Sequence, residues 1–293
     1  MINNLLYRGA NGFDSLNHFY ESEKVQRKLG SVLVISFIIS LVLVELQRQD
    51  FSFLLIPSFI PDNHFFAVDV AFTLLLVIEV ISLVLVLAES VARSVAKQFE
   101  IFALILIRKA FYEFGSFGEP IQWQELGEPV LHMLADAFGA LAVFTLLGFF
   151  YRYQKHKQIT SDMKAQNRFV SVKKMLALIM LVVFAVIGGL EIYKFSAGAK
   201  GFPFFDTFYT VLIFTDILIV LISLRYSTTF AIVFRNSGFA LSTVLIRLAL
   251  TAPPYVNVGL GLCAVLFALG LTLAYNRFGD LYSRDYRLQN LDD

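Results

Sequence analysis

The sequence is poor in charged residues and in cysteine. Only 16% of its 293 residues are charged and 57% are hydrophobic, whereas an ordinary soluble domain carries about 25% charge. The one cysteine, Cys263, excludes an intrachain disulfide and a cysteine-based metal site. This excess of apolar residues indicates a protein that has the bilayer as its solvent.

Common signatures of enzymes are also missing. The chain has no glycine-rich phosphate loop, HExxH sequence or recognisable Ser–His–Asp set, and its polar connections are too short for a catalytic domain. Glu128, His132 and Asp136 share one helix face, but three ligands from a single helix make a poor metal site. We therefore expect no enzyme activity, cofactor, metal or nucleic-acid partner.

Long apolar runs without period-two alternation predict transmembrane helices, each needing about 20 residues. The third run is the shortest, and the polar first 28 residues lack the apolar core of a signal peptide. Segment 51–61 is too short to span and is predicted to be interfacial or re-entrant, and residues 10–28 are predicted to form an amphipathic surface helix. The eight expected spans are 30–46, 65–88, 100–115, 129–151, 171–193, 203–224, 228–250 and 254–276.

Lysine and arginine collect in alternate connections, and this bias predicts the orientation. Cations are frequent in the N-terminal segment, in 89–99, in 152–174 and after the last span, whereas 112–128 contains only acidic charges. Because cytoplasmic loops carry the excess of lysine and arginine, both termini are expected to face the cytoplasm. The expected fold is an all-α integral membrane protein with eight spans.

The two halves of the chain share a pattern of charges and prolines. The shared spacing predicts a tandem duplication into two four-helix units of the same orientation, related by an axis along the membrane normal. The corresponding positions are Glu45 and Glu191, Glu79 and Asp216, Lys97 and Arg235, Arg108 and Arg247, and Pro129 and Pro254. The expected division is a cytoplasmic segment 1–29, a first repeat 30–151, a basic linker 152–170, a second repeat 171–276 and a cytoplasmic tail 277–293.

The second and third spans of each half carry a family resemblance. IEVISLVLVLAESVARSVAKQFEIFALILIRKAF and TDILIVLISLRYSTTFAIVFRNSGFALSTVLIRLAL resemble the phosphate-starvation-inducible E family of small bacterial membrane proteins. The resemblance lies in four spans, an acid in the second, and two bases about twelve residues apart around the third. Lys97 and Lys109 depart from the family pattern, as does the tandem arrangement, since the family is usually a single four-span unit. The resemblance implies this four-span architecture and a bacterial inner-membrane setting, and it implies no particular reaction.

Several charged side chains are expected inside the membrane. At about 1.5 Å per residue, Arg108 and Asp136 fall at the same depth and are predicted to pair. Arg247 is expected near Asn257 and Glu191. These groups are interpreted as clasps between helices, with snorkelling as an option for Arg247, or as an ion or substrate site.

Smaller contacts are expected as well. Lys109 and Glu45 are predicted to make a contact in the first half. Gly188, Gly189, Gly259 and Gly261 are expected to let helices approach closely.

Glu79 and Asp216 are expected deeper, without a base at their depth. They are interpreted either as proton- or cation-binding groups, or as neutral acids bonded to a hydroxyl, or as carboxylates near a wet interface. A voltage sensor is disfavoured because the bases do not recur every third residue.

We expect a non-enzymatic scaffold, stress-response component or accessory subunit of a membrane complex. Its expected partners are the lipid bilayer and other membrane proteins or a second copy of itself. The alternative is a transporter or channel for protons or a small ion that uses Glu79 and Asp216.

Overall fold

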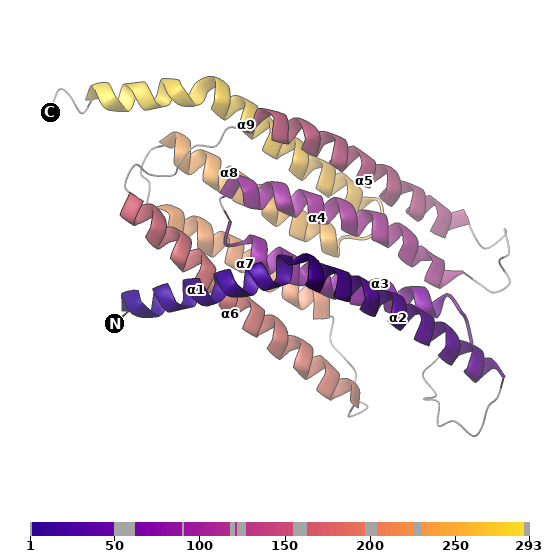
Figure 1. Ribbon diagram of the computed structural model, residues 1–293. Helices are drawn as coiled ribbons and strands as arrows, with labels where there is room; N and C mark the ends of the chain where they lie inside the picture. The colour runs from indigo at the N-terminus through magenta and orange to yellow at the C-terminus, as the bar shows by residue number, and fades with distance from the viewer. Residues whose placement is uncertain are drawn as a thin grey trace.

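A computed structural model describes residues 2–49, 62–89, 91–117, 121, 127–154, 163–196, 204–224 and 230–289. In these residues the regular structure is helical throughout (Figure 1). The helices are α1 (Ile2–Glu21), α2 (Glu23–Arg48), α3 (Phe66–Val86), α4 (Val91–Tyr112), the short 3-10 helix η1 (Glu113–Ser116), α5 (Gly127–Tyr153), α6 (Met163–Ser196), α7 (Phe204–Leu224), α8 (Phe230–Thr251) and α9 (Val256–Gln289).

Seven of these helices are long and apolar enough to cross a membrane, namely α2, α3 and α5 to α9. Leucine, valine and isoleucine dominate them, and in lipid their backbone amides must bond within the helix. The chain is therefore an all-helical, multi-pass membrane protein. The third expected span corresponds to α4, which is not among the seven, because Arg93, Lys97, Glu100, Arg108 and Lys109 fall within it.

Helices α4, α5, α8 and α9 form the centre of the bundle. α4 packs against α3, α5 and α8, while α9 packs against α5 and α8. Close approach is possible where a glycine faces a large side chain: a Cβ at Gly139 of α5 would lie 2.5 Å from Cγ1 of Val258, and one at Gly261 of α9 would overlap Phe102 of α4. The expectation for Gly261 is confirmed, whereas Gly189 and Gly259 have no neighbour within 4 Å of a Cβ.

The C-terminal end of α8 and the N-terminal end of α9 meet at a proline turn. α8 ends at Thr251 because Pro253 and Pro254 cannot supply backbone N–H groups to continue it. Tyr255 then adopts a φ of 68°, the left-handed region, and α9 begins at Val256. This turn fixes how α9 returns along α8.

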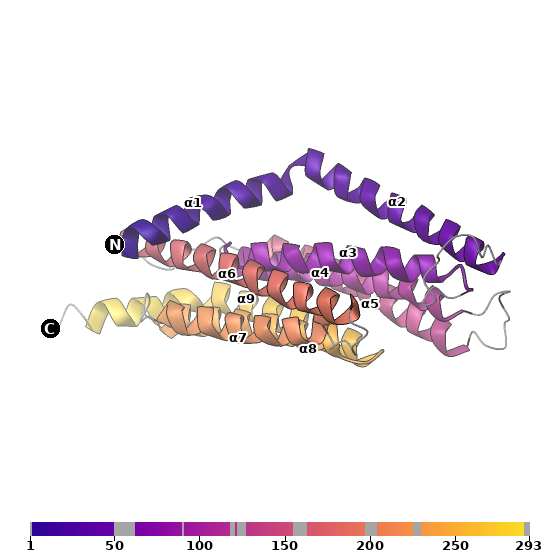
Figure 2. The same ribbon diagram turned by 90° about the horizontal axis from the view of Figure 1, so that it is seen from below.

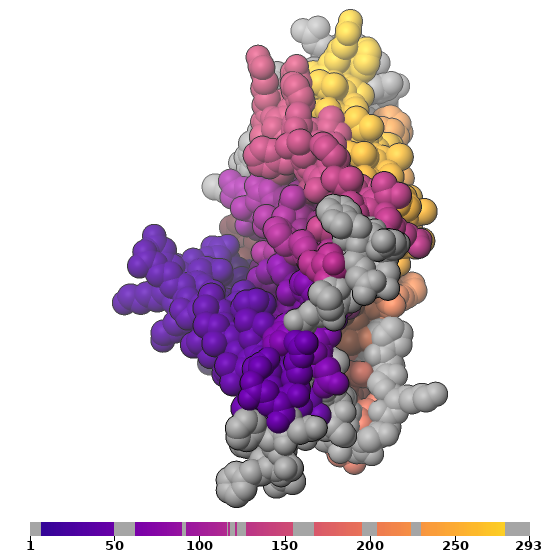
Figure 3. Space-filling model, turned by 90° about the vertical axis from the view of Figure 1, so that its right-hand side faces the viewer, coloured from indigo at the N-terminus to yellow at the C-terminus, as the bar shows by residue number. Residues whose placement is uncertain are grey.

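The N-terminal helices lie on one side of the bundle and are bent relative to each other (Figure 2). The bend is at Ser22, whose backbone is extended (φ −63°, ψ 137°). The expected amphipathic helix 10–28 is therefore wrong in its bounds: α1 ends at Glu21, and residues 23–28 open the first long apolar helix. The space-filling view shows α1 and α2 projecting from the bundle (Figure 3).

α1 is held against the other helices by named contacts. Ala10 and Phe13 are buried, and Lys174 of α6 forms an ion pair of 2.6 Å with Asp14. The Tyr20 hydroxyl donates to the backbone carbonyl of Ile78 over 2.8 Å, and its oxygen lies 2.7 Å from the Ser82 hydroxyl. Burial raises the pKa of Tyr20 above its ordinary value.

Two helices extend beyond their expected spans, and one expected segment lies outside the described residues. α6 begins at Met163, inside the expected linker 152–170, and α9 continues to Gln289 through most of the expected tail 277–293. Neither helix contains a proline, and both continue beyond their apolar runs as polar extensions. Residues 51–61, expected to be interfacial or re-entrant, are not described.

Candidate functional site

An acid of α3 pairs with an arginine of α4 in the first half of the chain. Arg108 forms an ion pair with Glu79, with 21% of the arginine side chain and 6% of the glutamate side chain exposed. Because Glu79 is buried, the arginine supplies the opposite charge that allows its carboxylate to lie there.

The same arrangement occurs between α7 and α8 in the second half. Arg247 Nε lies 3.6 Å from Asp216 Oδ2, and both side chains are buried. The three guanidinium nitrogens of Arg247 have no hydrogen-bond partner within the described residues. The contact is therefore an ion pair without a direct hydrogen bond, and the guanidinium keeps unused donors.

Helix direction explains why these residues meet. The Cα–Cβ bond of a helical residue tilts toward the N-terminus of its helix. α3 and α4 pack as consecutive helices that run in opposite directions, so Glu79 and Arg108 lean toward each other along the bundle. The same reasoning applies to Asp216 of α7 and Arg247 of α8.

Two predictions about these charges are wrong. Arg108 pairs with Glu79 and not with Asp136, and Glu79 and Asp216 each have a basic partner, contrary to the expectation that no base reaches their depth. The depth of an arginine Cα atom differs from the depth of its guanidinium, because the long side chain points back toward the N-terminus of its own helix.

Asp136 instead joins the two halves of the chain. Its Oδ1 accepts a 2.7 Å hydrogen bond from Asn257 Nδ2 of α9, and both side chains are buried. Lys109 of α4 donates to the backbone carbonyl of Leu250 over 3.1 Å, at the end of α8. These bonds link α4 to α8 and α5 to α9, and the proximity of Arg247 to Asn257 stays a prediction.

The remaining predicted residues lie near the ends of their helices. Glu45 Oε2 is 3.0 Å from His64 Nε2, and its Oε1 accepts a hydrogen bond from Gln49. The expected contact between Glu45 and Lys109 is wrong, because Lys109 donates to Leu250. Glu191 is half-buried in α6, and its proximity to Arg247 stays a prediction.

Lys173 is a buried charge that the sequence analysis did not single out. It lies in α6 with 3% of its surface exposed, and its ammonium donates to the backbone carbonyl of Glu89. It was counted with the surface cations because Lys174 follows it and a basic segment precedes it. Its position directly before an apolar run was the only signal that one of the two lysines could face the bundle.

A small polar cavity lies beside Asp216, between α4, α6, α7 and α8. Its volume is about 40 Å³, enough for water when polar partners surround it. The amide oxygen of Gln98 is buried without a hydrogen-bond partner in the described structure. The polar residues that line the cavity are Ser94, Gln98, Lys173, Asp216 and Thr243.

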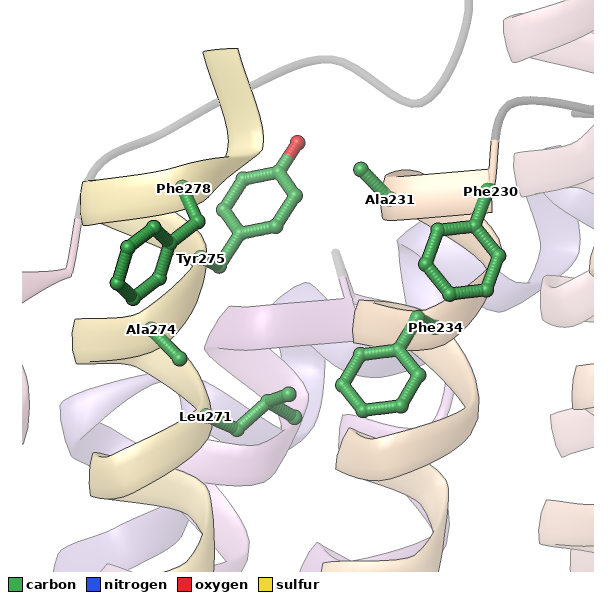
Figure 4. A pocket seen from close by; sticks show the side chains of 7 residues that line it. All are labelled: Phe230, Ala231, Phe234, Leu271, Ala274, Tyr275 and Phe278. Carbon is green, nitrogen blue, oxygen red and sulfur yellow. The ribbon is translucent and has the colours of Figure 1, made fainter. Parts of the chain in front are cut away.

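A second pocket, apolar and aromatic, lies between α8 and α9 (Figure 4). Its volume is about 230 Å³, and Phe230 and Phe234 of α8 face Tyr275 and Phe278 of α9 across it. The guanidinium of Arg235 lies 4.8 Å from the centre of the Tyr275 ring. Aromatic rings beside cations are typical of the end of a membrane span, so the pocket is suited to apolar material such as a lipid chain.

Among the described residues, no three His, Cys, Asp or Glu side chains lie close enough together to hold a metal ion. Comparison of the chain with protein-family models, with curated proteins and with solved structures found no match. The function has to be argued from the charges and cavities described above.

Proposed function

We propose that the chain is built from two copies of a four-helix unit, α2–α5 and α6–α9, and that α4 is an eighth span. Three relationships support the duplication. The acid–arginine pair joins the second and third helix of each unit, and α4 packs on α8 and α5 on α9, which are the corresponding helices. Corresponding helices meet in this way when an axis along the membrane normal relates the two units.

The proposed location is a bacterial inner membrane with both termini in the cytoplasm. The N-terminal end of α1 and the C-terminal end of α9 lie at the same end of the bundle (Figure 1). The excess of lysine and arginine favours the cytoplasm for that end. Fusion of a fluorescent protein to either terminus is expected to give fluorescence, whereas an alkaline phosphatase fusion, which needs periplasmic disulfides, is expected to be inactive. Active phosphatase at either terminus would contradict this orientation.

The proposed activity is that of a non-enzymatic scaffold or accessory subunit of a membrane complex. The observation that carries it is the pairing of each deep acid with an arginine of its own half. Paired charges hold neighbouring helices together, and each deep acid has an arginine of its own half as its counter-ion.

The surface available to a partner includes α2, the most peripheral of the apolar helices. Only Ser40 and Val44 are buried among its described residues. Aliphatic side chains cover its outer side, and each is more than half exposed: Val32, Val34, Ile35, Ile38, Ile39 and Val42. Such a surface fits lipid or another apolar helix.

Flux and co-purification distinguish the scaffold from a transporter. We expect no proton or small-ion flux in proteoliposomes for the wild type or for Glu79→Gln/Asp216→Asn, and a membrane partner in fixed stoichiometry after purification in mild detergent. Glu45→Gln, an acid at the end of α2, is the matched control. Flux in the wild type and in the control that the double substitution abolishes would overturn the scaffold.

The alternative is a protein that moves protons or a small ion, and one observation favours it. A cavity large enough for water adjoins Asp216, one of the two paired acids. Buried ionisable groups next to water are typical of proton and ion pathways in membranes. The result of the flux measurement decides between the two functions.

A further inference from the structure

Two cavities adjoin the contact between Lys173 and Glu89, which follows the C-terminal end of α3. We call the first the vestibule and the second the inner cavity. The vestibule has a volume of about 220 Å³ and lies between α1, α2, α3 and α4. Its polar lining consists of Asn17, Tyr20, Glu21, Gln26, Ser82, Glu89, Lys97 and Glu100. The inner cavity is the polar space of about 40 Å³ beside Asp216.

One contact links the lining of the vestibule to that of the inner cavity. Glu89 lines the vestibule, and its backbone carbonyl accepts the hydrogen bond of the Lys173 ammonium. Lys173 in turn lines the inner cavity. The lysine therefore touches a vestibule residue on one side and the space beside Asp216 on the other.

The inner cavity contains polar atoms that the protein leaves without hydrogen bonds. Gln98 is fully buried, and neither its amide oxygen nor Asp216 Oδ2, which forms the ion pair with Arg247, has a hydrogen-bond partner in the described residues. An unpaired buried polar group costs about 1–3 kcal/mol. A cavity needs only about 10–15 Å³ and two to four polar partners to hold a water molecule, so water satisfies both the space and the unpaired atoms.

We propose that the inner cavity holds water and makes Asp216 a proton-binding site, reached from the end of the bundle that carries the vestibule, with Lys173 as the group that closes the passage. Asp216 is faced by Arg247 from α8 and by Lys173 from α6, and Glu89 lies beyond the lysine. The inference holds for a scaffold as well as for a transporter, and for the latter it names the entry of the proton.

Silver ions test the water path because Ag⁺ is small, reacts with thiols and does not dissolve in lipid. The background is Cys263→Ala, which removes the one native thiol. Ser94→Cys places a thiol on the inner cavity, and Ser242→Cys is the matched control: Ser242 is fully buried in α8 and bonded to the carbonyl of Gly238, and it does not line the inner cavity. After exposure to Ag⁺ the protein is denatured and treated with an alkylating reagent. A thiol that has bound Ag⁺ is not alkylated, and mass spectrometry measures the unalkylated fraction.

We expect Ag⁺ to reach Ser94→Cys about a hundredfold faster than Ser242→Cys, because the control thiol reacts only through local opening. Lys173→Met keeps the shape of the side chain and removes a positive charge that repels Ag⁺, so we expect the rate at Ser94→Cys to rise about tenfold. Asp216→Asn removes a negative charge that attracts Ag⁺, so we expect the rate to fall by a similar factor. Equal rates for the two cysteines, or rates that ignore both charge substitutions, would overturn the water path.

Infrared spectroscopy of the protein in vesicles measures the protonation of the Asp216 carboxylate. Acidification is expected to produce a carboxylic C=O band that shifts in D₂O and is lost in Asp216→Asn, while Glu45→Gln leaves it in place. A band unaffected by Asp216→Asn would show that Asp216 binds no proton in this range and would overturn its assignment as a proton-binding site, even if Ag⁺ enters. Because neither measurement uses flux, the inference can fail while the scaffold stands.

Discussion

The side-chain amide of Asn257 donates a 2.7 Å hydrogen bond to Asp136, and this bond joins the first turn of α9 to α5 in the interior. The two residues belong to different halves of the chain. Together with the contact of Lys109 with the Leu250 carbonyl, it connects the halves on the side of the bundle away from the vestibule.

Removing the amide should loosen the contact between α5 and α9. Asn257→Ala leaves the buried Asp136 without its donor, and we expect a loss of about 1.5–3 kcal/mol, as for hydrogen bonds to charged groups. The measurement is thermal or denaturant unfolding in detergent. Thr210→Ala, which removes an exposed intrahelical bond to Asp206, is expected to change stability by less than about 0.5 kcal/mol. Equal effects of the two substitutions would argue against the link.

The two ion pairs should differ in strength because their burial differs. Arg247→Met leaves Asp216 buried without its arginine and is expected to destabilise by about 3–5 kcal/mol, while Asp216→Asn/Arg247→Met costs much less. The pair of Glu79 with Arg108 should show the same non-additivity at a smaller size, since 21% of the Arg108 side chain is exposed against none of Arg247. A double-substitution cycle in unfolding experiments checks both, and additive losses would mean that the pairs are not coupled.

Two glycines of α9 provide a comparison within a single turn. Gly261→Ala is expected to destabilise by about 1–3 kcal/mol, because its new methyl group would overlap the ring of Phe102. Gly259→Ala has free space and should be neutral or stabilise by up to about 1 kcal/mol through its helix propensity. Thermal unfolding of both variants side by side is the measurement. If Gly261→Ala were as stable as Gly259→Ala, α4 and α9 would not pack as described.

The Tyr20 hydroxyl should determine how firmly α1 is docked. Tyr20→Phe keeps the ring and removes the hydrogen bonds with Ile78 and Ser82, at a cost of about 1 kcal/mol. We expect faster amide hydrogen exchange in α1 with no change in α9. Tyr7→Phe, which alters a largely exposed tyrosine of the same helix, is the control, and exchange that rises equally in both variants would remove the role assigned to Tyr20.

Apolar runs and charge types could be predicted from the sequence, whereas contacts between helices could not. The apolar stretches correspond to α2, α3 and α5–α9 because length and hydropathy are local properties. The pairing of Arg108 was missed because a depth along one helix says nothing of the rotation of its neighbour or the direction of its side chain. Asp136 and Asn257 were both singled out, yet their contact depends on the packing of α5 against α9.

Lys173 shows a different limit. Its neighbour Lys174 reaches Asp14 on the surface, while Lys173 itself turns into the bundle. In a helix, consecutive residues point about 100° apart, so Lys173 points into the bundle while Lys174 points toward Asp14. Sequence composition cannot tell which of the two is buried, because that choice depends on where α1 and α3 lie.

The position of each base after its acid has a consequence for biogenesis. α4 carries five charged residues and would enter a bilayer poorly by itself. In both halves the carboxylate is synthesised before the arginine that it neutralises, Glu79 before Arg108 and Asp216 before Arg247. We therefore expect each arginine helix to insert after the helix that carries its counter-ion, and a chain with the order of the two helices reversed to insert its arginine helix less efficiently.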